Sequence, residues 1–271
     1  MNKELKLAIE TAEEAGAILL QYYGTNLDVS IKDNNTPVSN ADIAANNFII
    51  EKLSANFPYP ILSEESADNQ DRLHSYKIWI VDPLDGTRDF IGKTGEFAIE
   101  IALVQTGEPI LGVVYAPVTK ELFWAEKGRG AYRKTDAGVQ TLKVSKIDSF
   151  SEARFTIPTL SPEQISAMED MGAKNRTRVG SIALKMCRIA QGEYEAYFFP
   201  TSRTSEWADC GAGVILTEAG GALSDLFGKP LLYNQPSAKR TRGIVASNGV
   251  LHSEILKRVS SITKERYEML N

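Results

Sequence analysis

The most constraining feature of the sequence is the stretch WIVDPLDGTRDF, residues 79–90, in which two aspartates directly follow an apolar run. Asp82 and Asp85 are separated by only two residues, the first of which is Pro83. The proline ring fixes its own φ and biases Asp82 toward an extended conformation, while Gly86 allows close backbone approach. The sequence therefore predicts a stiff turn that holds two carboxylates close together at the end of a strand.

Carboxylates that are held close together repel one another unless they are protonated or neutralised by a cation. A second acidic group, Glu64 and Glu65 in LSEES, also follows an apolar run. Either group alone is typical of a solvated loop. Together they form a set of hard oxygen ligands without His or Cys, which suits Mg²⁺ or Mn²⁺, and a shared carboxylate commonly holds two such ions about 4 Å apart.

The kind of metal indicates the kind of chemistry. Mg²⁺ is usually held by a few carboxylates together with substrate phosphate, so an all-carboxylate site points to phosphoryl transfer or phosphate ester hydrolysis. The sequence contains neither a P-loop nor the motifs of a protein kinase. Hydrolysis by a metal-activated water is the reaction that these residues favour.

Composition excludes other classes of protein. The 271 residues are 43% hydrophobic and carry a net charge of −5, which argues against a nucleic acid polymer as partner. No uninterrupted apolar run approaches the ~20 residues of a membrane span. The two cysteines, Cys187 and Cys210, fit free buried thiols in a reducing compartment. We expect a cytoplasmic protein, with peripheral membrane association and a homodimer left open.

Hydrophobic periodicity divides the chain into two different halves. Apolar residues recur at spacings of three and four over residues 3–23 and 41–57, which predicts two helices. Residues 78–125 contain short β-branched and aromatic runs separated by turn signals, which predicts a mostly antiparallel meander. The second half alternates strand candidates with helix candidates, as in layered α/β proteins. These helix candidates span residues 162–171, 181–191, 206–219 and 249–259.

The two halves are expected to form two lobes around a shared cleft. An N-terminal α+β lobe, residues 1–140, would carry the antiparallel sheet and the acidic motifs. A C-terminal α/β lobe, residues 141–271, would complete the cleft. The boundary is expected near residues 135–150.

Five segments together carry a resemblance to a known family. They are TPVSNADIAAN (36–46), PILSEES (60–66), VDPLDGTRDFI (81–91), GEFAIEIALVQTGEPILGVVYAPV (95–118) and TEAGG (217–221). These segments resemble the inositol monophosphatase superfamily of Mg²⁺-dependent, lithium-sensitive phosphatases, and the first 118 residues are most similar to its CysQ type, the 3'(2'),5'-bisphosphate nucleotidases. The resemblance implies an α/β (α+β) fold, a layered αβαβα sandwich of the inositol monophosphatase and fructose-1,6-bisphosphatase type.

The resemblance also implies a metal site with two or three Mg²⁺ ions. Glu64, Asp82 and the backbone carbonyl of Leu84 would hold one ion. Asp82, Asp85 and an aspartate of the segment EWADCG would hold the second.

The same resemblance implies catalytic and substrate-binding roles. Glu64 and the Thr87 hydroxyl would orient the attacking water, with Asp42 supporting Thr87. The amides of Gly86 and Thr87 would receive phosphate oxygens, a role that helix N-terminal electrostatics also favours. The rest of the substrate would contact Gly180 and Ser181, together with Asp85 and Asp209.

The segment EWADCG departs from the family pattern. In the family an aspartate directly follows the tryptophan, and counting back from the TEAGG turn places Ala208 at that position. A shift of one residue on a helix rotates a side chain by about 100°. We name Asp209 as the ligand, on the condition that the helix starts later or is locally tightened, and Glu206 as a less favoured substitute.

The substrate is the second open choice. Hydrolysis of 3'-phosphoadenosine 5'-phosphate to AMP and phosphate is the leading interpretation, and it requires cations for the second phosphate. An inositol monophosphatase or broad sugar phosphatase is the alternative, in which Glu206 and Ser181 would contact the ring. A catalytically weak sensor that binds metal and nucleotide is an alternative of another class. The cationic candidates are Arg88, Lys93, Arg178 and Arg203.

Overall fold

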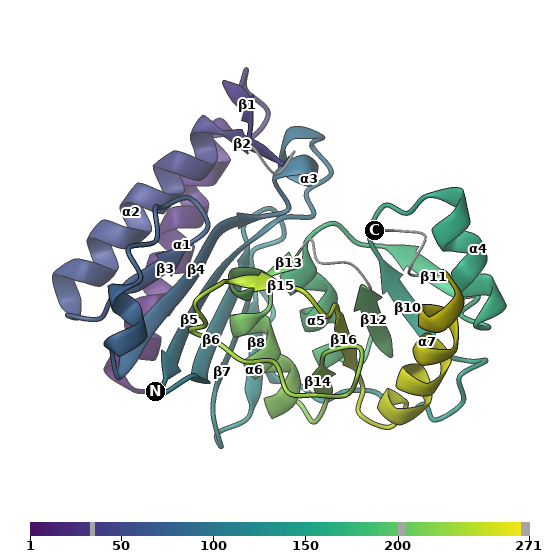
Figure 1. The fold of residues 1–271 in the computed structure, drawn as a ribbon. Coiled ribbons are helices and arrows are strands. Elements are labelled where there is room, and N and C mark those ends of the chain that lie inside the picture. The colour runs from purple at the N-terminus through teal and green to yellow at the C-terminus, as the bar shows by residue number, and fades with distance from the viewer. Residues whose placement is uncertain (33–35, 200–203, 267–271) are drawn as a thin grey trace.

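Two helices at the N-terminus lie side by side and cover one face of a large sheet (Figure 1). The computed structural model describes residues 1–32, 36–199 and 204–266. In helix α1, Lys3–Tyr22, the Asn2 side chain accepts a hydrogen bond from the Leu5 amide over 2.7 Å and caps the first turn. Helix α2, Asn40–Asn56, buries Ala45, Ile49 and Leu53. Both predicted helices are confirmed.

The large sheet has seven strands in the order β3-β4-β5-β6-β7-β8-β9. Its first pair, β3 and β4, is parallel and every later pair is antiparallel. The predicted meander is therefore confirmed. The strands are β3 Ile61–Ser63, β4 Lys77–Asp85, β5 Ala98–Gln105, β6 Glu108–Ala116, β7 Glu121–Glu126, β8 Ala131–Thr135 and β9 Gly138–Thr141.

Short elements flank the two ends of this sheet. A small hairpin pairs β1, Val29–Ile31, with β2, Pro37–Ser39. Helix α3, Thr87–Ile91, follows β4 directly, and the 3₁₀ turn η1, Asp71–His74, lies between β3 and β4 in the sequence. The hairpin and α3 lie close together at the top of Figure 1.

A second sheet forms in the C-terminal half with the strand order β11-β10-β12-β16-β14. Helices α4 and α7 cover its outer face, and α5 and α6 lie between the two sheets (Figure 1). The strands are β10 Arg154–Ile157, β11 Asn175–Arg178, β12 Ala196–Phe199, β14 Ala222–Ser224 and β16 Ile244–Ser247, with a separate pair β13 Thr204–Ser205 and β15 Lys239–Arg240. The helices are α4 Pro162–Asp170, α5 Ile182–Ala190, α6 Cys210–Glu218 and α7 His252–Arg266.

One predicted helix is wrong in detail. The expected helix over residues 206–219 is a 3₁₀ turn, η2 Glu206–Ala208, followed by α6. The break falls at Asp209, whose backbone has a φ of −137° and is not helical. The helix predicted at 249–259 begins at His252 and continues to Arg266.

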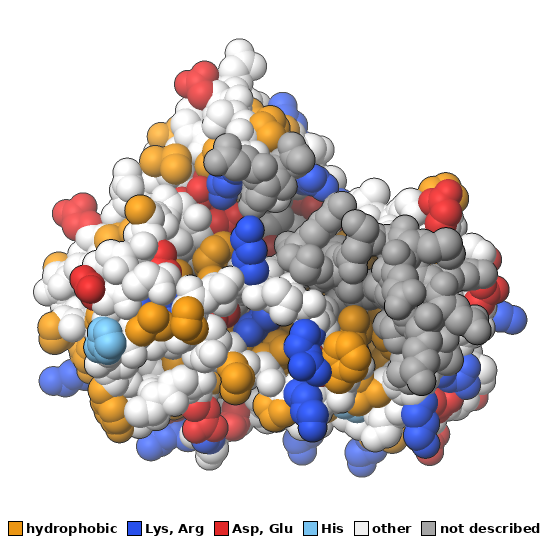
Figure 2. Space-filling view, in the orientation of Figure 1, with side chains coloured by type: hydrophobic (Ala, Val, Ile, Leu, Met, Phe, Trp, Pro, Cys, Tyr) orange, Lys and Arg blue, Asp and Glu red, His pale blue; other side chains and the backbone are white. Residues whose placement is uncertain are grey.

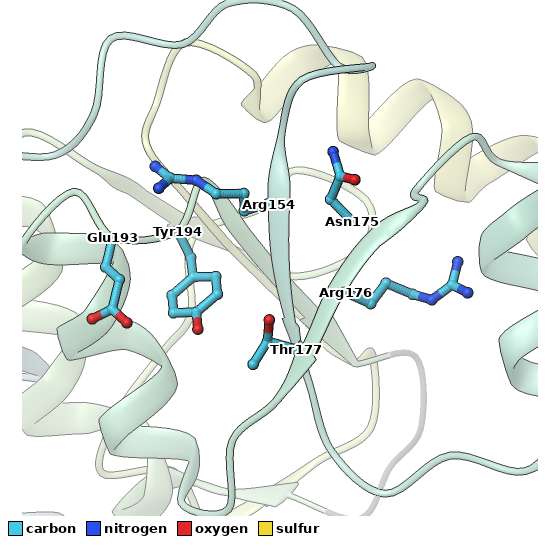
Figure 3. A pocket seen from close by; sticks show the side chains of 6 residues that line it. All are labelled: Arg154, Asn175, Arg176, Thr177, Glu193 and Tyr194. Carbon is cyan, nitrogen blue, oxygen red and sulfur yellow. The ribbon is translucent and has the colours of Figure 1, made fainter.

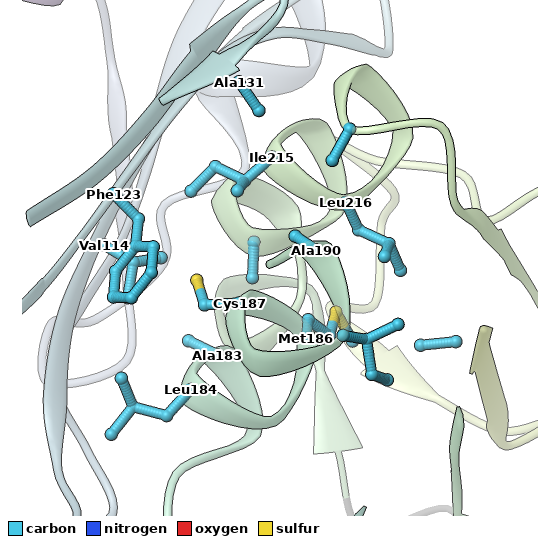
Figure 4. Packing of buried hydrophobic residues seen from close by; sticks show 14 of the residues in the cluster. Val114, Phe123, Ala131, Ala183, Leu184, Met186, Cys187, Ala190, Ile215 and Leu216 are labelled. Carbon is cyan, nitrogen blue, oxygen red and sulfur yellow. The ribbon is translucent and has the colours of Figure 1, made fainter. Parts of the chain in front are cut away.

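The layer of α5 and α6 joins the two sheets through one hydrophobic cluster. Val114 and Phe123 of the large sheet face Cys187 of α5 and Ile215 of α6 in Figure 4. Tyr197 and Ala246 of the second sheet belong to the same cluster and are almost fully buried. The order of layers is therefore αβαβα, as predicted. Since the middle layer packs on both sheets, the division into lobes at residue 140 stays a prediction.

No helix in the ranges that the structure describes is long and apolar enough to span a bilayer.

The N-terminal end of α6 approaches strand β6 closely enough to exclude side chains. A Cβ atom added to Gly112 would lie 2.1 Å from the carbonyl oxygen of Gly211. This contact is between two backbones, so it cannot be relieved by a change of rotamer. The pair of glycines therefore sets the distance between α6 and the sheet.

We predict that Gly112→Ala lowers the free energy of unfolding by about 3 kcal/mol, the upper end of the usual overpacking cost. Urea denaturation followed by circular dichroism measures it. Gly24→Ala is the control, because a Cβ there meets nothing within 4 Å, so only the strain of its φ of 85° remains, roughly 1 kcal/mol. Equal losses in the two variants would contradict the close-approach argument.

Candidate active site

The turn after β4 places two carboxylates in the interior. Asp82 and Asp85 are 2% and 8% exposed, and the pairing of β4 with β5 shifts between them. Pro83 lies at this irregularity because proline has no amide hydrogen to give to a sheet. The Leu84 amide instead donates to Asp82 Oδ1 over 3.1 Å.

Gly86 closes this turn in a conformation that favours glycine. Its φ is 99°, and an added Cβ would lie 3.0 Å from the carbonyl oxygen of Glu96. The chain therefore passes from β4 into α3 within one residue. Thr87 is the first residue of α3 as a result.

Thr87 is connected to helix α2 by a hydrogen bond. Its Oγ1 donates to Asp42 Oδ1 over 3.0 Å and lies 3.3 Å from the Leu84 carbonyl oxygen. The other oxygen of Asp42 accepts hydrogen bonds from the amide and hydroxyl of Ser39, at 2.8 and 2.6 Å. Burial raises the pKa of Asp42 above its ordinary value. Both of its oxygens are used, which fixes the Thr87 hydroxyl.

Asp85 contacts the N-terminal end of helix α5. Its Oδ2 accepts hydrogen bonds from Ser181 Oγ at 2.5 Å and from the Ala183 amide at 2.7 Å. Gly180 precedes this contact, and a Cβ there would lie 2.4 Å from the Asp89 carboxyl carbon, so no larger residue fits. The sequence-predicted residues Asp85, Gly180 and Ser181 thus lie together.

Glu64 lies beside the Asp82 strand because β3 and β4 are parallel. The Glu64 amide donates to the Val81 carbonyl oxygen over 3.2 Å. Lys32, which follows β1, donates to Glu64 Oε1 at 2.9 Å and to Glu65 Oε1 at 2.5 Å. Sequence reasoning missed this lysine, since nothing in its local sequence shows which residues it will face.

Glu100 is a further acid that sequence reasoning missed. It lies on β5 directly opposite Asp82 and is fully buried. Its Oε1 accepts hydrogen bonds from the amides of Gly211 and Ala212 at 2.5 and 3.3 Å. The sequence did carry a signal, because this is the one acid inside the apolar run FAIEIALV.

Asp209 lies in the same region but faces a cation. Arg240 donates to it through Nε at 2.8 Å and through Nη2 at 2.6 Å, and both side chains are buried. Glu206 accepts hydrogen bonds from the amides of Asn234 and Gln235, at 2.7 and 3.0 Å. The role of Asp209 as a metal and substrate ligand stays a prediction, and this bidentate ion pair counts against it.

The cationic residues that the sequence suggests for binding the second phosphate of the substrate already have other partners, where the structure describes them. Arg178 donates to Asp89 at 2.5 Å and to Glu96 at 2.8 Å. Lys93 lies 3.3 Å from the Gly24 carbonyl oxygen. Arg88 has a partner as well, and Arg203 lies outside the described residues.

A separate cavity of about 360 Å³ lies on the edge of the second sheet, away from these acids (Figure 3). Arg154 and Arg176 line it, together with Tyr194. Arg154 is already bound to Glu195 and Arg176 to Glu169. The cavity therefore offers no unpaired charge at which a phosphate would be held.

Comparison with known proteins identifies the family. The profile of the Inositol monophosphatase family matches residues 1–264. This chain belongs to the inositol monophosphatase family.

Individual relatives cover most of the chain. The 3'(2'),5'-bisphosphate nucleotidase CysQ of Aggregatibacter actinomycetemcomitans is 35% identical over 240 residues, 85% of this chain and 87% of the relative. The IMPase of Thermotoga maritima superposes with a TM-score of 0.85 and 27% identity, covering 97% of this chain and 99% of that one. CysQ of Bacteroides thetaiotaomicron gives a TM-score of 0.73 and 29% identity, covering 90% and 97%. The predicted family and fold type are confirmed.

The family is generally metal-dependent, and the donors of this chain fit a hard cation. Burial raises the pKa of Asp82 well above its ordinary value, and Glu64, Asp85 and Glu100 raise it further. Acidic side chains also line the base of the hollow below β1, β2 and α3 (Figure 2). The described residues do not gather three acids at ready metal-binding geometry. The fit rests on an all-oxygen donor set whose crowding a cation would relieve.

We predict that the stability of the metal-free protein falls as the pH rises from about 4.5 to about 7. Burial raises the pKa of Glu65 from 4.5 to about 7, so the folded state binds this proton more tightly than the unfolded state does. The resulting stabilisation is fully present below pH 4.5 and is lost as the pH passes 7. Asp82 and Glu100 shift in the same direction, and they outweigh the single His252, whose pKa burial lowers and which acts in the opposite direction.

Thermal unfolding in EDTA across this pH range measures the effect. Glu65→Gln is the comparison variant and should flatten the pH dependence, because glutamine does not titrate. Mg²⁺ should also reduce it, by stabilising the ionised carboxylates. A melting temperature of the metal-free protein that rises over the same range would contradict the prediction.

We predict that Asp209→Asn lowers the free energy of unfolding by about 3–5 kcal/mol, because it leaves the buried Arg240 without its counter-ion. Urea denaturation in EDTA measures the loss. The double variant Asp209→Leu with Arg240→Met should recover much of it, since apolar residues can replace a buried ion pair. If Asp209 serves instead as a metal ligand, Asp209→Asn will weaken Mg²⁺ binding and change the stability in EDTA little.

Proposed function

We propose that the chain is a Mg²⁺-dependent phosphate monoester hydrolase. Its substrate on this proposal is 3'-phosphoadenosine 5'-phosphate, which it converts to AMP and phosphate as a 3'(2'),5'-bisphosphate nucleotidase. The observation that carries the hydrolase proposal is the buried group of carboxylates around Asp82. Burial and the neighbouring acids raise the pKa of Asp82. The CysQ relatives, similar over most of the chain, support the choice of substrate.

The ligands proposed for the metal ions come from three segments. Glu64, Asp82 and the Leu84 carbonyl would hold one ion. Asp82 and Asp85 would hold a second. The sequence predicts Asp209 as its third ligand, but Arg240 binds both Asp209 oxygens, so this position is the open one of the set. When bound, Mg²⁺ lowers the pKa of a water molecule and stabilises negative charge on the ester oxygens. A count of two or three ions is part of this proposal.

The attacking water would be oriented by Thr87 and Glu64. The hydroxyl hydrogen of Thr87 is directed to Asp42 Oδ1 at 3.0 Å, the shorter of its two contacts. The Thr87 oxygen therefore has lone pairs with which to accept a hydrogen bond from the water. Glu64 would accept the second hydrogen. This orientation aligns the water for direct in-line attack on phosphorus, with no covalent intermediate on the protein.

The phosphate would be received at the start of α3. The backbone amides of Gly86 and Thr87 directly follow Asp85 at the start of α3, where they can donate to phosphate oxygens. Ser181 would contact the rest of the substrate through the end of α5 that it caps. Its hydroxyl also donates to Asp85, which couples substrate position to the metal ligands.

An inositol monophosphatase or broad sugar phosphatase is the second candidate. One observation favours it: the IMPase of Thermotoga maritima superposes with a higher TM-score, 0.85, than CysQ of Bacteroides thetaiotaomicron, 0.73. The engagement of Asp209 by Arg240 keeps a catalytically weak metal and nucleotide sensor as the candidate of another class. The cytoplasmic location and the homodimer stay predictions of the sequence.

Phosphate release from a substrate panel tests this proposal. We expect 3'-phosphoadenosine 5'-phosphate to be hydrolysed with a higher kcat/KM than inositol 1-phosphate in Mg²⁺. Asp85→Asn should reduce kcat/KM by roughly 100-fold or more, since charge stabilisation by a metal is worth several kcal/mol. Asp225→Asn is the matched control, because Asp225 is a buried aspartate paired with Arg242 in a different region.

The outcomes separate the candidates. A preference for inositol 1-phosphate would contradict the nucleotidase proposal and support an inositol monophosphatase or broad sugar phosphatase. Nucleotide binding without turnover would favour the sensor. Full activity of Asp85→Asn would overturn the metal site.

A further inference from the structure

Glu100 is a buried carboxylate with half of its hydrogen-bonding capacity unused. Its side chain is fully buried, and Oε1 accepts hydrogen bonds from the amides of Gly211 and Ala212. Oε2 is also buried and has no hydrogen-bond partner within the described part of the chain. A buried carboxylate oxygen without a partner is costly, so it calls for an explanation.

Strand pairing places Glu100 on the same face of the sheet as the two aspartates. Glu100 pairs directly with Asp82, and Ala98, two residues earlier, pairs with Asp85. Residues that are directly opposite in an antiparallel pair point to the same face, with Cβ atoms about 4.5–5.5 Å apart. Three carboxylates, of Asp82, Asp85 and Glu100, therefore project from one face of β4 and β5.

That face is turned toward the N-terminal end of α6. Ile78 and Ile80, which share the face with Asp82, pack in one cluster with Cys210. An added Cβ on Gly211 would lie 3.1 Å from Glu100 Cγ, so the helix backbone lies directly against the glutamate. Burial raises the pKa of Glu100 well above its ordinary value, and Asp85 and Asp209 contribute to the shift.

The end of α6 is also where this chain lacks an expected donor. Ala208 offers only a methyl group, and the carboxylate of Asp209 is bound through both oxygens by Arg240. Neither side chain therefore completes a second ion alongside Asp82 and Asp85. Glu100 approaches the same end of α6 from the sheet, since its Oε1 accepts hydrogen bonds from the Gly211 and Ala212 amides.

We propose that Glu100 is a metal ligand, which through Oε2 completes the second cation site with Asp82 and Asp85. The inference rests on the proposed function, because it assigns a ligand to the site described there. Oε1 keeps its hydrogen bonds to the start of α6 and holds the side chain in place. The ligand set is then three carboxylates from two adjacent strands, and Asp209 serves the fold through its pair with Arg240.

Counting bound Mn²⁺ by electron paramagnetic resonance tests the proposal without measuring turnover. We expect two ions on the wild-type protein. Glu100→Gln keeps a carbonyl oxygen for the helix amides but removes the charge. As a direct ligand its loss should weaken binding of the second ion by more than about 100-fold, beyond the 10- to 100-fold loss typical of an outer-shell partner. The other ion should be retained. Adding Ala208→Asp to Glu100→Gln should restore the second ion.

Glu121→Gln is the matched control, because Glu121 is a buried glutamate of the same sheet that is already paired with Arg133 and Arg188. It should leave both Mn²⁺ affinities unchanged. Glu100→Asp provides a second variant if Glu100→Gln does not fold. Its carboxylate is one methylene shorter, so it should also weaken the second ion.

The results distinguish the possible failures. Two ions with unchanged affinity in Glu100→Gln would overturn the assignment, and a lower melting temperature in EDTA would then assign Glu100 to anchoring α6 alone. Fewer than two ions on the wild-type protein would overturn the two-ion site itself, which is a failure of the proposed function. The weakened second ion and its recovery by Ala208→Asp would support Glu100 as the ligand.

Discussion

The structure depends on one electrostatic constraint, the burial of several like-charged carboxylates where the large sheet meets the helical layer. Asp82, Asp85 and Glu100 are almost or fully buried on adjacent strands. Backbone amides at the starts of α5 and α6 offset part of the repulsion at Asp85 and Glu100. Asp82 receives only the Leu84 amide among the hydrogen bonds of the described residues. A cation is what this arrangement still requires.

The surrounding fold can be understood as the means of maintaining that arrangement. The glycine pair of β6 and α6 allows the helix to lie against the sheet, so its first amides reach Glu100. Gly180 allows the start of α5 to approach in the same way, so Ser181 reaches Asp85. Lys32 supplies a positive charge to Glu64 and Glu65 at the rim. Deeper inside, the buried Lys185 counteracts the rise in the pKa of Asp85, but its ammonium group donates to the carbonyl oxygens of Gly180 and Ser181.

Local signals made much of this predictable from the sequence. Pro83 and Gly86 act within their own turn, so the acidic turn was predictable from local signals, and the helix formed by residues 40–56 followed from periodicity. The contact of Asp42 with Thr87 was expected only from the resemblance to the family. The sequence did not predict which residues of distant segments would contact one another. The ion pair of Asp209 with Arg240 joins the residue between η2 and α6 to β15, and no local pattern indicates which residues such a pairing will bring together.

Glu100 shows how a site can be kept while its sequence motif changes. Coordination of a metal depends on the position of the oxygen atom, not on the segment of the chain that carries it. Antiparallel pairing puts residue 100 next to residue 82, although 18 positions separate them in the chain. An acid on β5 can therefore occupy space that an acid at the start of α6 would otherwise fill. Ala208 leaves this space free because its side chain is only a methyl group. A family match across the chain, such as this one over residues 1–264, is compatible with that exchange because the backbone need not move.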